Sequence, residues 1–118
     1  MILVDTSVWI DHLRRGNARL ARLLGDGVVL SHPFVIGEIA CGALRQRATV
    51  LSLLAELPRV TTATHPEILG FIEARHLIGR GLGYVDVHLL AAASLDRVRL
   101  WTLDKRLDAA ARALDVAP

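Results

Sequence analysis

The sequence predicts an α/β domain with a mainly parallel sheet. Short apolar runs of strand length alternate with longer segments of helical periodicity, which is the order found in parallel sheets covered by helices. Several of these short runs end on an acid or a hydroxyl, at the edge where open parallel sheets carry their ligands. The length of 118 residues fits a single domain. We therefore expect residues 1–118 to form one folding unit.

The first half of the chain contains two predicted strands and four predicted helices. Thr6 or Ser7 is expected to cap the first helix, and Ser31 or His32 the third, with Pro33 in its first turn. The expected elements are a strand over Ile2–Val4, a helix to about Arg15, a helix over about Ala18–Leu24, a strand over Val28–Leu30, and helices over Phe34–Leu44 and Ala48–Leu57.

The second half repeats this alternation. Thr64 is followed by Pro66 and Glu67, which is a capping hydroxyl with an early proline and an acid three residues after the cap. The expected elements are a strand over Arg59–Thr61, a helix from Thr64 to about Ile78, a helix from Tyr84 to about Asp96, a strand over Leu100–Leu103, a helix over Lys105–Leu114 and a short final strand at Val116.

The charge balance is informative only if the acids gather in one place. Fourteen basic residues, thirteen of them Arg, face twelve acidic ones, for a net charge of +2 and a pI of about 9.3. Arginine matches the geometry of phosphate and carboxylate groups, although codon bias also produces Arg-rich chains. The apolar fraction is 53% and the mean hydropathy +0.41. This surplus leaves surface for self-association or for a protein partner.

Several classes of protein are excluded. No apolar run reaches the ~18 residues of a membrane span, and no signal peptide precedes the first strand. Cys41 has no disulfide partner, so a reducing cytoplasm is the expected setting. The sequence has no glycine-rich nucleotide loop, no His and Cys spacing typical of zinc sites, and no His–Asp pair to activate Ser7.

Four acids stand apart from the others, which lie in polar surroundings near arginines. Asp5 closes the first strand, and Asp104 follows the fourth; each also occupies a position where it could cap the next helix. Glu38 lies on an almost wholly apolar helix without a local partner, so it must pair with a distant arginine or face a cleft. Asp86 lies in the first turn of a helix, where acids are favoured, but apolar residues flank it.

Together the four acids predict a metal site. If the strand order is 3-2-1-4-5, Asp5 and Asp104 end neighbouring strands at the point where the order reverses. Four carboxylates within a few ångströms need a counter-charge, and Mg²⁺ or Mn²⁺ held by one or two of them supplies it. A metal at such a cluster activates water and neutralises charge on a phosphoryl oxygen, as phosphodiester cleavage requires.

These motifs resemble the PIN-domain ribonucleases, and more closely the VapC toxins of bacterial toxin–antitoxin pairs. The resemblance is carried along the whole chain by MILVDTSVWID at residues 1–11, the Glu of VIGEIACG, the Asp of GYVDVHLLAAA and the Asp of LWTLDKRL. It implies a three-layer α/β/α sandwich and a metal-dependent endoribonuclease. Asp5 and Asp86 would be the principal Mg²⁺ ligands, with Mn²⁺ able to substitute. Glu38 and Asp104 would complete the catalytic site.

The same resemblance implies hydroxyls near the site at Thr6 and Thr102, a homodimer, and a cognate antitoxin that covers the cleft. We expect arginines outside the cleft to hold flanking RNA phosphates. The candidates are Arg14, Arg15, Arg45, Arg47 and Arg106. The aromatic content of 4% argues against an extended platform for stacking bases.

Two other functions remain open at this point. A signalling receiver domain also gathers acids around Mg²⁺, and Asp5, Thr102 and Lys105 could be interpreted in that way. A receiver, however, has an acidic pair after its first strand, where Thr6 and Ser7 stand here. A catalytically idle interaction module is the second alternative, and the intact set of four acids argues against it.

Overall fold

The computed structural model describes all 118 residues and confirms the α/β prediction. The elements alternate between short strands and helices, and most begin within two residues of the predicted position. In chain order they are β1 (Ile2–Val4), α1 (Thr6–Arg15), α2 (Ala18–Gly25), β2 (Val29–Leu30), α3 (Pro33–Ala40), α4 (Arg47–Glu56), α5 (His65–Ala74), α6 (Tyr84–Asp96), β3 (Arg99–Trp101) and α7 (Lys105–Ala113).

The sheet has three parallel strands in the order β2-β1-β3. Leu3 in the central strand is in register with Leu30 on one side and with Leu100 on the other. These strands are the second, first and fourth of the predicted order 3-2-1-4-5. The carboxyl ends of β1 and β3 therefore lie side by side, as the order requires for Asp5 and Asp104 to approach each other.

The two predicted edge strands are present only in reduced form. Arg59 forms a single parallel bridge with Ser31, and the Leu100 N–H donates to the Val116 carbonyl at 2.7 Å. Both contacts lie at the expected edges of the sheet. Pro58 has no N–H to donate, and Asp115 has a positive φ of 57° directly before Val116. These residues keep either segment from extending into a full ladder.

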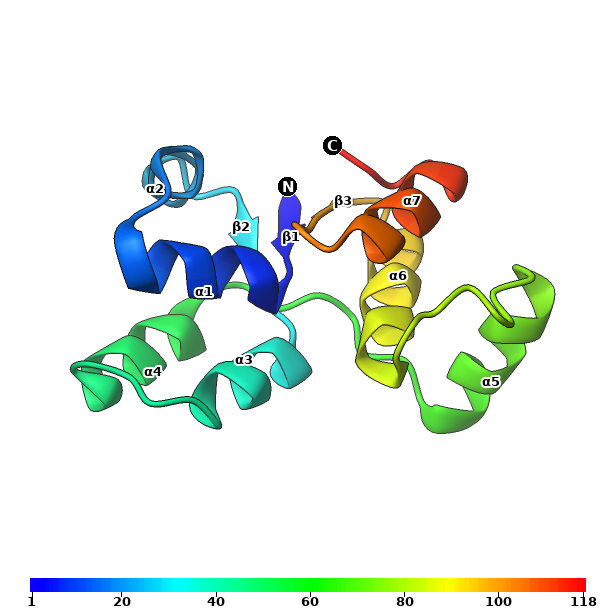
Figure 1. Cartoon of the computed structure of the whole chain (residues 1–118), viewed down its shortest axis with the longest axis horizontal. Coiled ribbons are helices and arrows are strands. Elements are labelled where there is room, and N and C mark those ends of the chain that lie inside the picture. Colours follow the sequence, from blue (N-terminus) through cyan, green and yellow to red (C-terminus); the bar gives the residue numbers. More distant parts are fainter.

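The core surrounds the sheet, and α6 is the helix that contributes most residues to it. This helix buries seven consecutive residues, 87–93, because it is apolar on nearly every side and small at Ala91–Ala93. Leu3 and Val4 are fully buried, and Trp9 and Trp101 are core residues. Figure 1 shows α1–α4 on one side of the sheet and α5–α7 on the other, in a molecule of 40 × 24 × 23 Å.

Two helices are shorter than predicted. α3 ends at Ala40 instead of Leu44, because the chain turns at Cys41 and Gly42 and enters α4 through Gln46 in the left-handed conformation. α5 ends at Ala74 instead of about Ile78. His76 there has a φ of 55°, and the next residue closes the helix by donating its N–H to the Ile72 carbonyl. The apolar periodicity of the sequence continues past the C-terminal ends of α3 and α5, so it does not mark where these helices end.

Two predicted helix caps are confirmed. His32 accepts the Phe34 N–H through Nδ1 and so caps α3, which has Pro33 in its first turn. Thr64 and Glu67 form the reciprocal capping box of α5. Each cap satisfies a backbone group that the first turn of the helix leaves without a partner.

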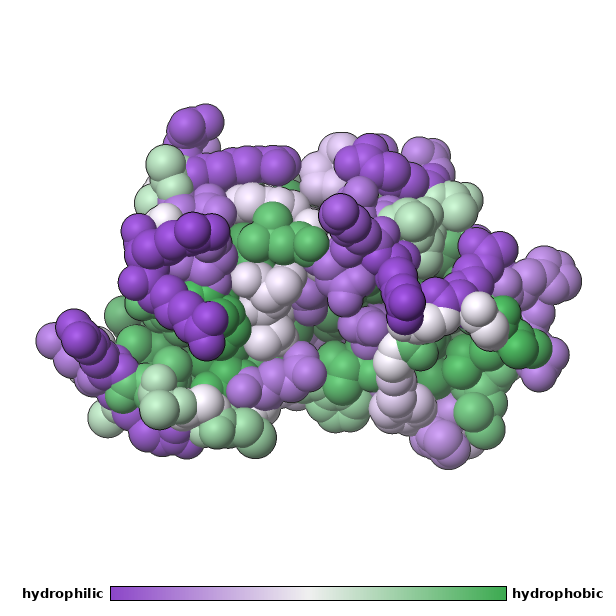
Figure 2. Space-filling view, viewed as in Figure 1, coloured by the Kyte–Doolittle hydropathy of each residue, from purple (hydrophilic) through white to green (hydrophobic).

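The surface carries apolar groups at both ends of the long axis. Figure 2 shows hydrophobic side chains gathered over the α3–α4 end and over α5, with hydrophilic ones along the upper edge. Exposed members include Leu53 in α4, Leu69 in α5 and Ile78 after it. None of the helices is both long enough and apolar enough to span a bilayer. Cys41 is a free, exposed thiol at the end of α3.

Candidate functional site

The four unusual acids come from four separate elements and converge at the carboxyl edge of the sheet. Asp5 follows β1, Glu38 lies in α3, Asp86 lies in the first turn of α6, and Asp104 precedes α7. Their proximity has an electrostatic consequence. Burial raises the pKa of Asp86, and the negative charges of Asp5, Asp104 and Glu38 raise it further against the opposing effect of a backbone hydrogen bond from Gly83.

Asp5 is the most buried of the four, with 7% of its surface exposed. Its Oδ2 atom accepts hydrogen bonds from the Thr102 hydroxyl at 2.7 Å and the Ser7 hydroxyl at 2.8 Å. No hydrogen bond within the chain reaches its Oδ1 atom. The carboxylate is therefore fixed through one oxygen, and the other oxygen is left for a ligand.

The prediction that Thr6 or Ser7 caps α1 is wrong. Asp5 itself occupies the cap position, and no side chain there bonds to the first turn of the helix. Both hydroxyls lie inside the helix and point to carboxylates instead: Ser7 to Asp5, and Thr6 to Glu38. A hydroxyl that caps a helix accepts a backbone N–H, whereas these two hydroxyls donate to carboxylates, and hydrogen bonds to charged acceptors are stronger than those to neutral ones.

The same two hydroxyls that hold Asp5 also shape the turn between β3 and α7. The Leu103 N–H donates to the Ser7 hydroxyl and the Asp104 N–H donates to the Thr102 hydroxyl, each at 3.0 Å. Each hydroxyl thus donates to Asp5 and accepts from the turn. This chain of bonds ties the position of Asp104 to the position of Asp5.

Glu38 has a hydroxyl partner instead of a cation. Its Oε1 atom accepts from the Thr6 hydroxyl at 2.7 Å, and the side chain is exposed. Pairing with a distant arginine was the alternative explanation for this residue, and no such ion pair forms. The contact joins α3 to α1 and directs the carboxylate toward the sheet edge.

Asp86 folds back over the start of its own helix. Its Oδ2 atom accepts the Gly83 N–H at 2.8 Å, and a Cβ on Gly83 would lie 3.5 Å from that oxygen. The preceding loop packs more closely at Gly81, where a Cβ would stand 2.7 Å from an Nη atom of Arg106. Because Gly81 has a φ of +72°, glycine is favoured there, and a larger residue would also have to displace the Arg106 side chain.

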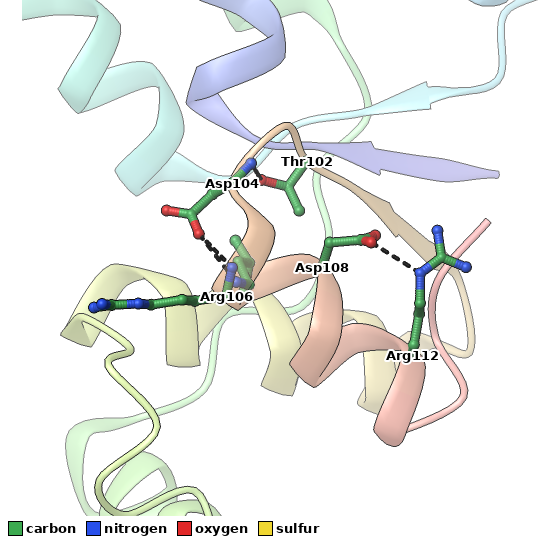
Figure 3. Close-up of polar contacts among 6 residues, drawn as sticks. Thr102, Asp104, Arg106, Asp108 and Arg112 are labelled. Atoms are coloured by element: carbon green, nitrogen blue, oxygen red, sulfur yellow. Dashed lines mark hydrogen bonds and ion pairs between the residues drawn. The ribbon is translucent and has the colours of Figure 1, made fainter.

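Asp104 does cap α7, as one of the two explanations for it proposed. Its Oδ1 atom accepts the Arg106 and Leu107 N–H groups at 2.9 and 3.1 Å. Figure 3 shows this cap together with the bond to Thr102, and shows the Arg106 side chain extended away from the carboxylate. The second carboxylate oxygen takes no hydrogen bond from the chain, so capping and ligand binding are compatible.

No basic side chain neutralises these four acids. The ion pairs of the molecule lie elsewhere, between Arg15 and Asp11, Arg99 and Asp115, and Arg112 and Asp108. Four carboxylates without a basic partner, in a chain with fourteen cationic side chains, form a donor set suited to a hard divalent cation. No three of them are close enough to enclose an ion. The arrangement fits Mg²⁺, which is bound by one or two carboxylates with water as its other ligands.

Sequence reasoning missed two features of this region. Ser7 was interpreted only as a helix cap, although its position two residues after a strand-ending acid is a signal for contact with that acid. The ring of His88 is buried and contacts the exposed rings of Phe34 and Tyr84, neither of which local patterns single out. Those contacts join residues far apart in the sequence, so local patterns carry no signal for them.

Comparison with known proteins gives a consistent result. A model of the PIN domain matches residues 2–113. Ribonuclease VapC32 of Mycobacterium tuberculosis, in strains CDC 1551 / Oshkosh and ATCC 25618 / H37Rv, is 53% identical over 118 residues, which cover 99% of this chain and 95% of that protein.

Among solved structures, the crystal structure of PAE2754 from Pyrobaculum aerophilum superimposes with a TM-score of 0.65. It is 17% identical in sequence, and the match covers 92% of this chain and 83% of that one. At this identity the likeness concerns the fold alone. The family model and the relatives of high identity go further, and with the carboxylate site in place they show that the chain belongs to the PIN-domain family, in its VapC ribonuclease branch.

Proposed function

We propose that this protein is an endoribonuclease that acts as the toxin of a toxin–antitoxin pair. The observation that carries the proposal is the group of four carboxylates, drawn from four elements and lacking any basic partner. The 53% identity to a ribonuclease of nearly the same length supports RNA as the substrate. A receiver domain or an idle interaction module is not favoured, because the chain matches the PIN domain along almost its full length.

A divalent cation, Mg²⁺ or Mn²⁺, would be held by Asp5 and Asp86. Asp5 offers its free Oδ1 atom, and Asp86 is partly buried among the other acids. When bound, such a cation supplies activation of water and neutralisation of charge on the scissile phosphate. Glu38 and Asp104 would accept protons and hydrogen bonds from the attacking water, and thereby orient it for in-line hydrolysis.

Of the five arginines expected to hold flanking phosphates, three have side chains without a partner that would compete with RNA. Arg15 pairs with Asp11, and Arg47 donates to the Gly42 and Ala40 carbonyls at the end of α3. Arg14 and Arg45 make no ion pair and line one groove of 410 Å³, and Arg106 lies over the Gly81 loop. These three are free to bind RNA phosphates, a contribution that is sensitive to salt.

The apolar surface supports a protein partner. A groove of 470 Å³ between α1, α2 and α4 is lined mostly by apolar residues, among them Trp9, Leu13 and Leu53. Burying such a surface against an antitoxin or a second copy of the chain would remove apolar area from water. We propose a cognate antitoxin as a partner, a homodimer as the assembly and the cytoplasm as the location.

The test is cleavage of cellular RNA by the purified protein in Mg²⁺ or Mn²⁺. Asp5→Asn and Asp86→Asn should each reduce the rate by at least about a hundredfold, since each removes a proposed metal ligand, and EDTA should abolish cleavage. Asp26→Asn is the matched control, because Asp26 is an exposed acid outside the site and its loss should leave the rate unchanged. Undiminished cleavage in Asp5→Asn, Asp86→Asn or EDTA would overturn the assignment.

A further inference from the structure

A cluster of five rings lies where the N-terminal ends of α3 and α6 meet. We call it the ring cluster; its members are His32, Phe34, His65, Tyr84 and His88. The His88 ring centre lies 4.6 Å from those of both Phe34 and Tyr84. His32 packs on Phe34 at 5.1 Å, and His65 packs on Tyr84 at 5.6 Å.

The rings of Phe34, His65 and Tyr84 are open to solvent. Phe34 and Tyr84 are 36% and 44% exposed, whereas His32 and His88 beneath them are buried. The chain has only five Phe, Trp and Tyr side chains, and these two are the exposed ones. Both contact the same imidazole, so the exposed aromatic surface of the molecule is concentrated at one place.

The exposed rings are held in position. The Tyr84 hydroxyl lies 2.7 Å from Nδ1 of His65, which fixes the phenol from the side of α5. Phe34 packs against both His32 and His88. An aromatic ring that is exposed but immobilised loses little conformational entropy when a ligand stacks on it, which is a property of recognition surfaces.

The ring cluster borders the carboxylate site. Phe34 lies four residues before Glu38 in α3, so the two side chains share one face of that helix. Tyr84 occupies the same first turn of α6 as Asp86. A polymer with its phosphate at the carboxylates would therefore place a neighbouring unit at the exposed rings.

The floor of the cluster has unused hydrogen-bonding capacity. His88 is 3% exposed, and neither of its ring nitrogens has a hydrogen-bond partner in the chain. A neutral imidazole has one donor and one acceptor nitrogen. A ligand edge that reached His88 between the exposed rings would give a partner to a polar group that the protein itself leaves unpaired.

We propose that Phe34 and Tyr84 form a base-binding subsite, on which one nucleobase of single-stranded RNA stacks next to the bond that is cleaved. This inference rests on the proposed ribonuclease function and adds the place where the substrate base is bound. Stacking on aromatic side chains is the usual means of binding unpaired bases, and it tolerates different sequences because every base has a π face. Two rings suffice for one base, in keeping with the low aromatic content of the chain.

The experiment measures base stacking separately from cleavage. Binding of a short single-stranded 2′-O-methyl oligoadenylate is compared with binding of an abasic chain of equal length by fluorescence anisotropy. Asp104→Asn is the background, because it should block cleavage and keep the helix cap. The expected ratio of the two affinities falls by about 5- to 150-fold in Tyr84→Leu and in Phe34→Leu, whereas Tyr84→Phe keeps the ratio because it keeps the ring.

Two controls make the outcomes separable. Leu69→Ala removes an exposed apolar side chain of α5 outside the cluster and should change neither affinity, and thermal melts verify that every variant is folded. If Tyr84→Leu and Phe34→Leu bind both probes as the background does, the subsite is refuted, even where the unmodified protein cleaves RNA. If those variants keep the ratio but lose binding to a protein partner, the rings serve that partner and the subsite is likewise refuted. Failure of the unmodified protein to cleave RNA refutes the proposed function instead.

Discussion

At the scale of single residues, the geometry of Asp5 depends on two neighbours that carry no charge. Ser7 and Thr102 both donate to the same carboxylate oxygen, and both are tied to the turn that precedes α7. Hydrogen bonds of this kind around a metal ligand fix its orientation and are worth about ten- to a hundredfold in affinity or rate. Thr102 is therefore a positioning residue for the proposed site.

This role predicts the behaviour of Thr102→Val. The substitution keeps the shape of the side chain but removes its hydroxyl, so Mg²⁺ affinity and RNA cleavage should both fall by about ten- to a hundredfold. Thr102→Ser retains the hydroxyl and should behave like the unmodified protein. Calorimetric titration with Mg²⁺ measures the affinity without relying on cleavage. Equal Mg²⁺ affinities for the two variants would contradict the role.

His32 predicts a dependence of stability on pH. Burial, together with repulsion from a positive charge on His88, lowers the pKa of His32 from 6.5 to about 4 in the folded protein. As the pH falls from 6.5 toward 4, the unfolded chain therefore binds a proton that the folded chain does not. The contribution of neutral His32 to the free energy of unfolding is complete above the unfolded pKa and is lost as the pH falls across this window. The loss amounts to about 2 kcal/mol between pH 7 and pH 5.

The variant His32→Asn separates this effect from the cap. Asparagine can accept the Phe34 N–H as a helix cap but does not titrate. Urea unfolding at about pH 7 and about pH 5 should show the unmodified protein losing roughly 2 kcal/mol more than the variant. The same loss in both proteins would show that His32 is not the group responsible.

The acids of the site were predictable because each is anomalous in its own surroundings. Glu38 has no local partner on an apolar helix, and Asp5 directly follows an apolar strand. The resemblance implied hydroxyls near the site at Thr6 and Thr102, but the link between Ser7 and Thr102, which are 95 positions apart, and the ring cluster were not predictable. Local sequence patterns describe neighbours along the chain and not across the sheet.

At the scale of elements, α7 shows one residue serving both structure and chemistry. Asp104 caps the helix through one carboxylate oxygen and leaves the other for the proposed site. The two explanations considered for it, a helix cap and a site acid, are therefore compatible. Element positions were well predicted where a cap marks the start, as at α5 and α7. They were less accurate where helix ends depend on left-handed residues, such as His76.

Substitution at Asp104 should separate the two roles. Asp104→Asn keeps an oxygen that can cap α7 and removes the charge, whereas Asp104→Ala removes both. Cleavage should be strongly reduced in both variants, but only Asp104→Ala should lose stability, by about 1 kcal/mol. Chemical denaturation and RNA cleavage measured on the same preparations test this. Equal loss of stability in the two variants would indicate that the charge, and not the cap, is what stabilises the helix.

At the scale of the whole molecule, the site lies between the two halves of the fold. Asp5 and Glu38 belong to the half that contains α1–α4, whereas Asp86 and Asp104 belong to the half that contains α6 and α7. The overall architecture and the central strand order could be predicted because alternation and right-handed crossovers leave few topologies. The near-loss of the edge strands could not, because it depends on a few backbone angles.

This placement predicts that Asp86→Asn is more thermally stable than the unmodified protein without metal, and that Mg²⁺ stabilises the unmodified protein more than the variant. Without metal, Asp86→Asn should melt at a higher temperature than the unmodified protein, because it removes one of four repelling charges. Mg²⁺ at a hundred times its Kd should stabilise the unmodified protein by about 2.7 kcal/mol and the variant by much less. Differential scanning calorimetry in EDTA and in Mg²⁺ measures both. No Mg²⁺-dependent shift in the unmodified protein would argue against a metal site here.

The bond between Asp5 and Thr102 can form only late in the synthesis of the chain. The two residues are 97 positions apart, so a ribosome adding 5–20 residues per second needs about 5 to 20 s to reach the second after the first. Through that interval the emerging chain lacks Asp104 and the support for Asp5. A nuclease whose site needs Asp104 cannot cleave RNA before translation has passed that residue.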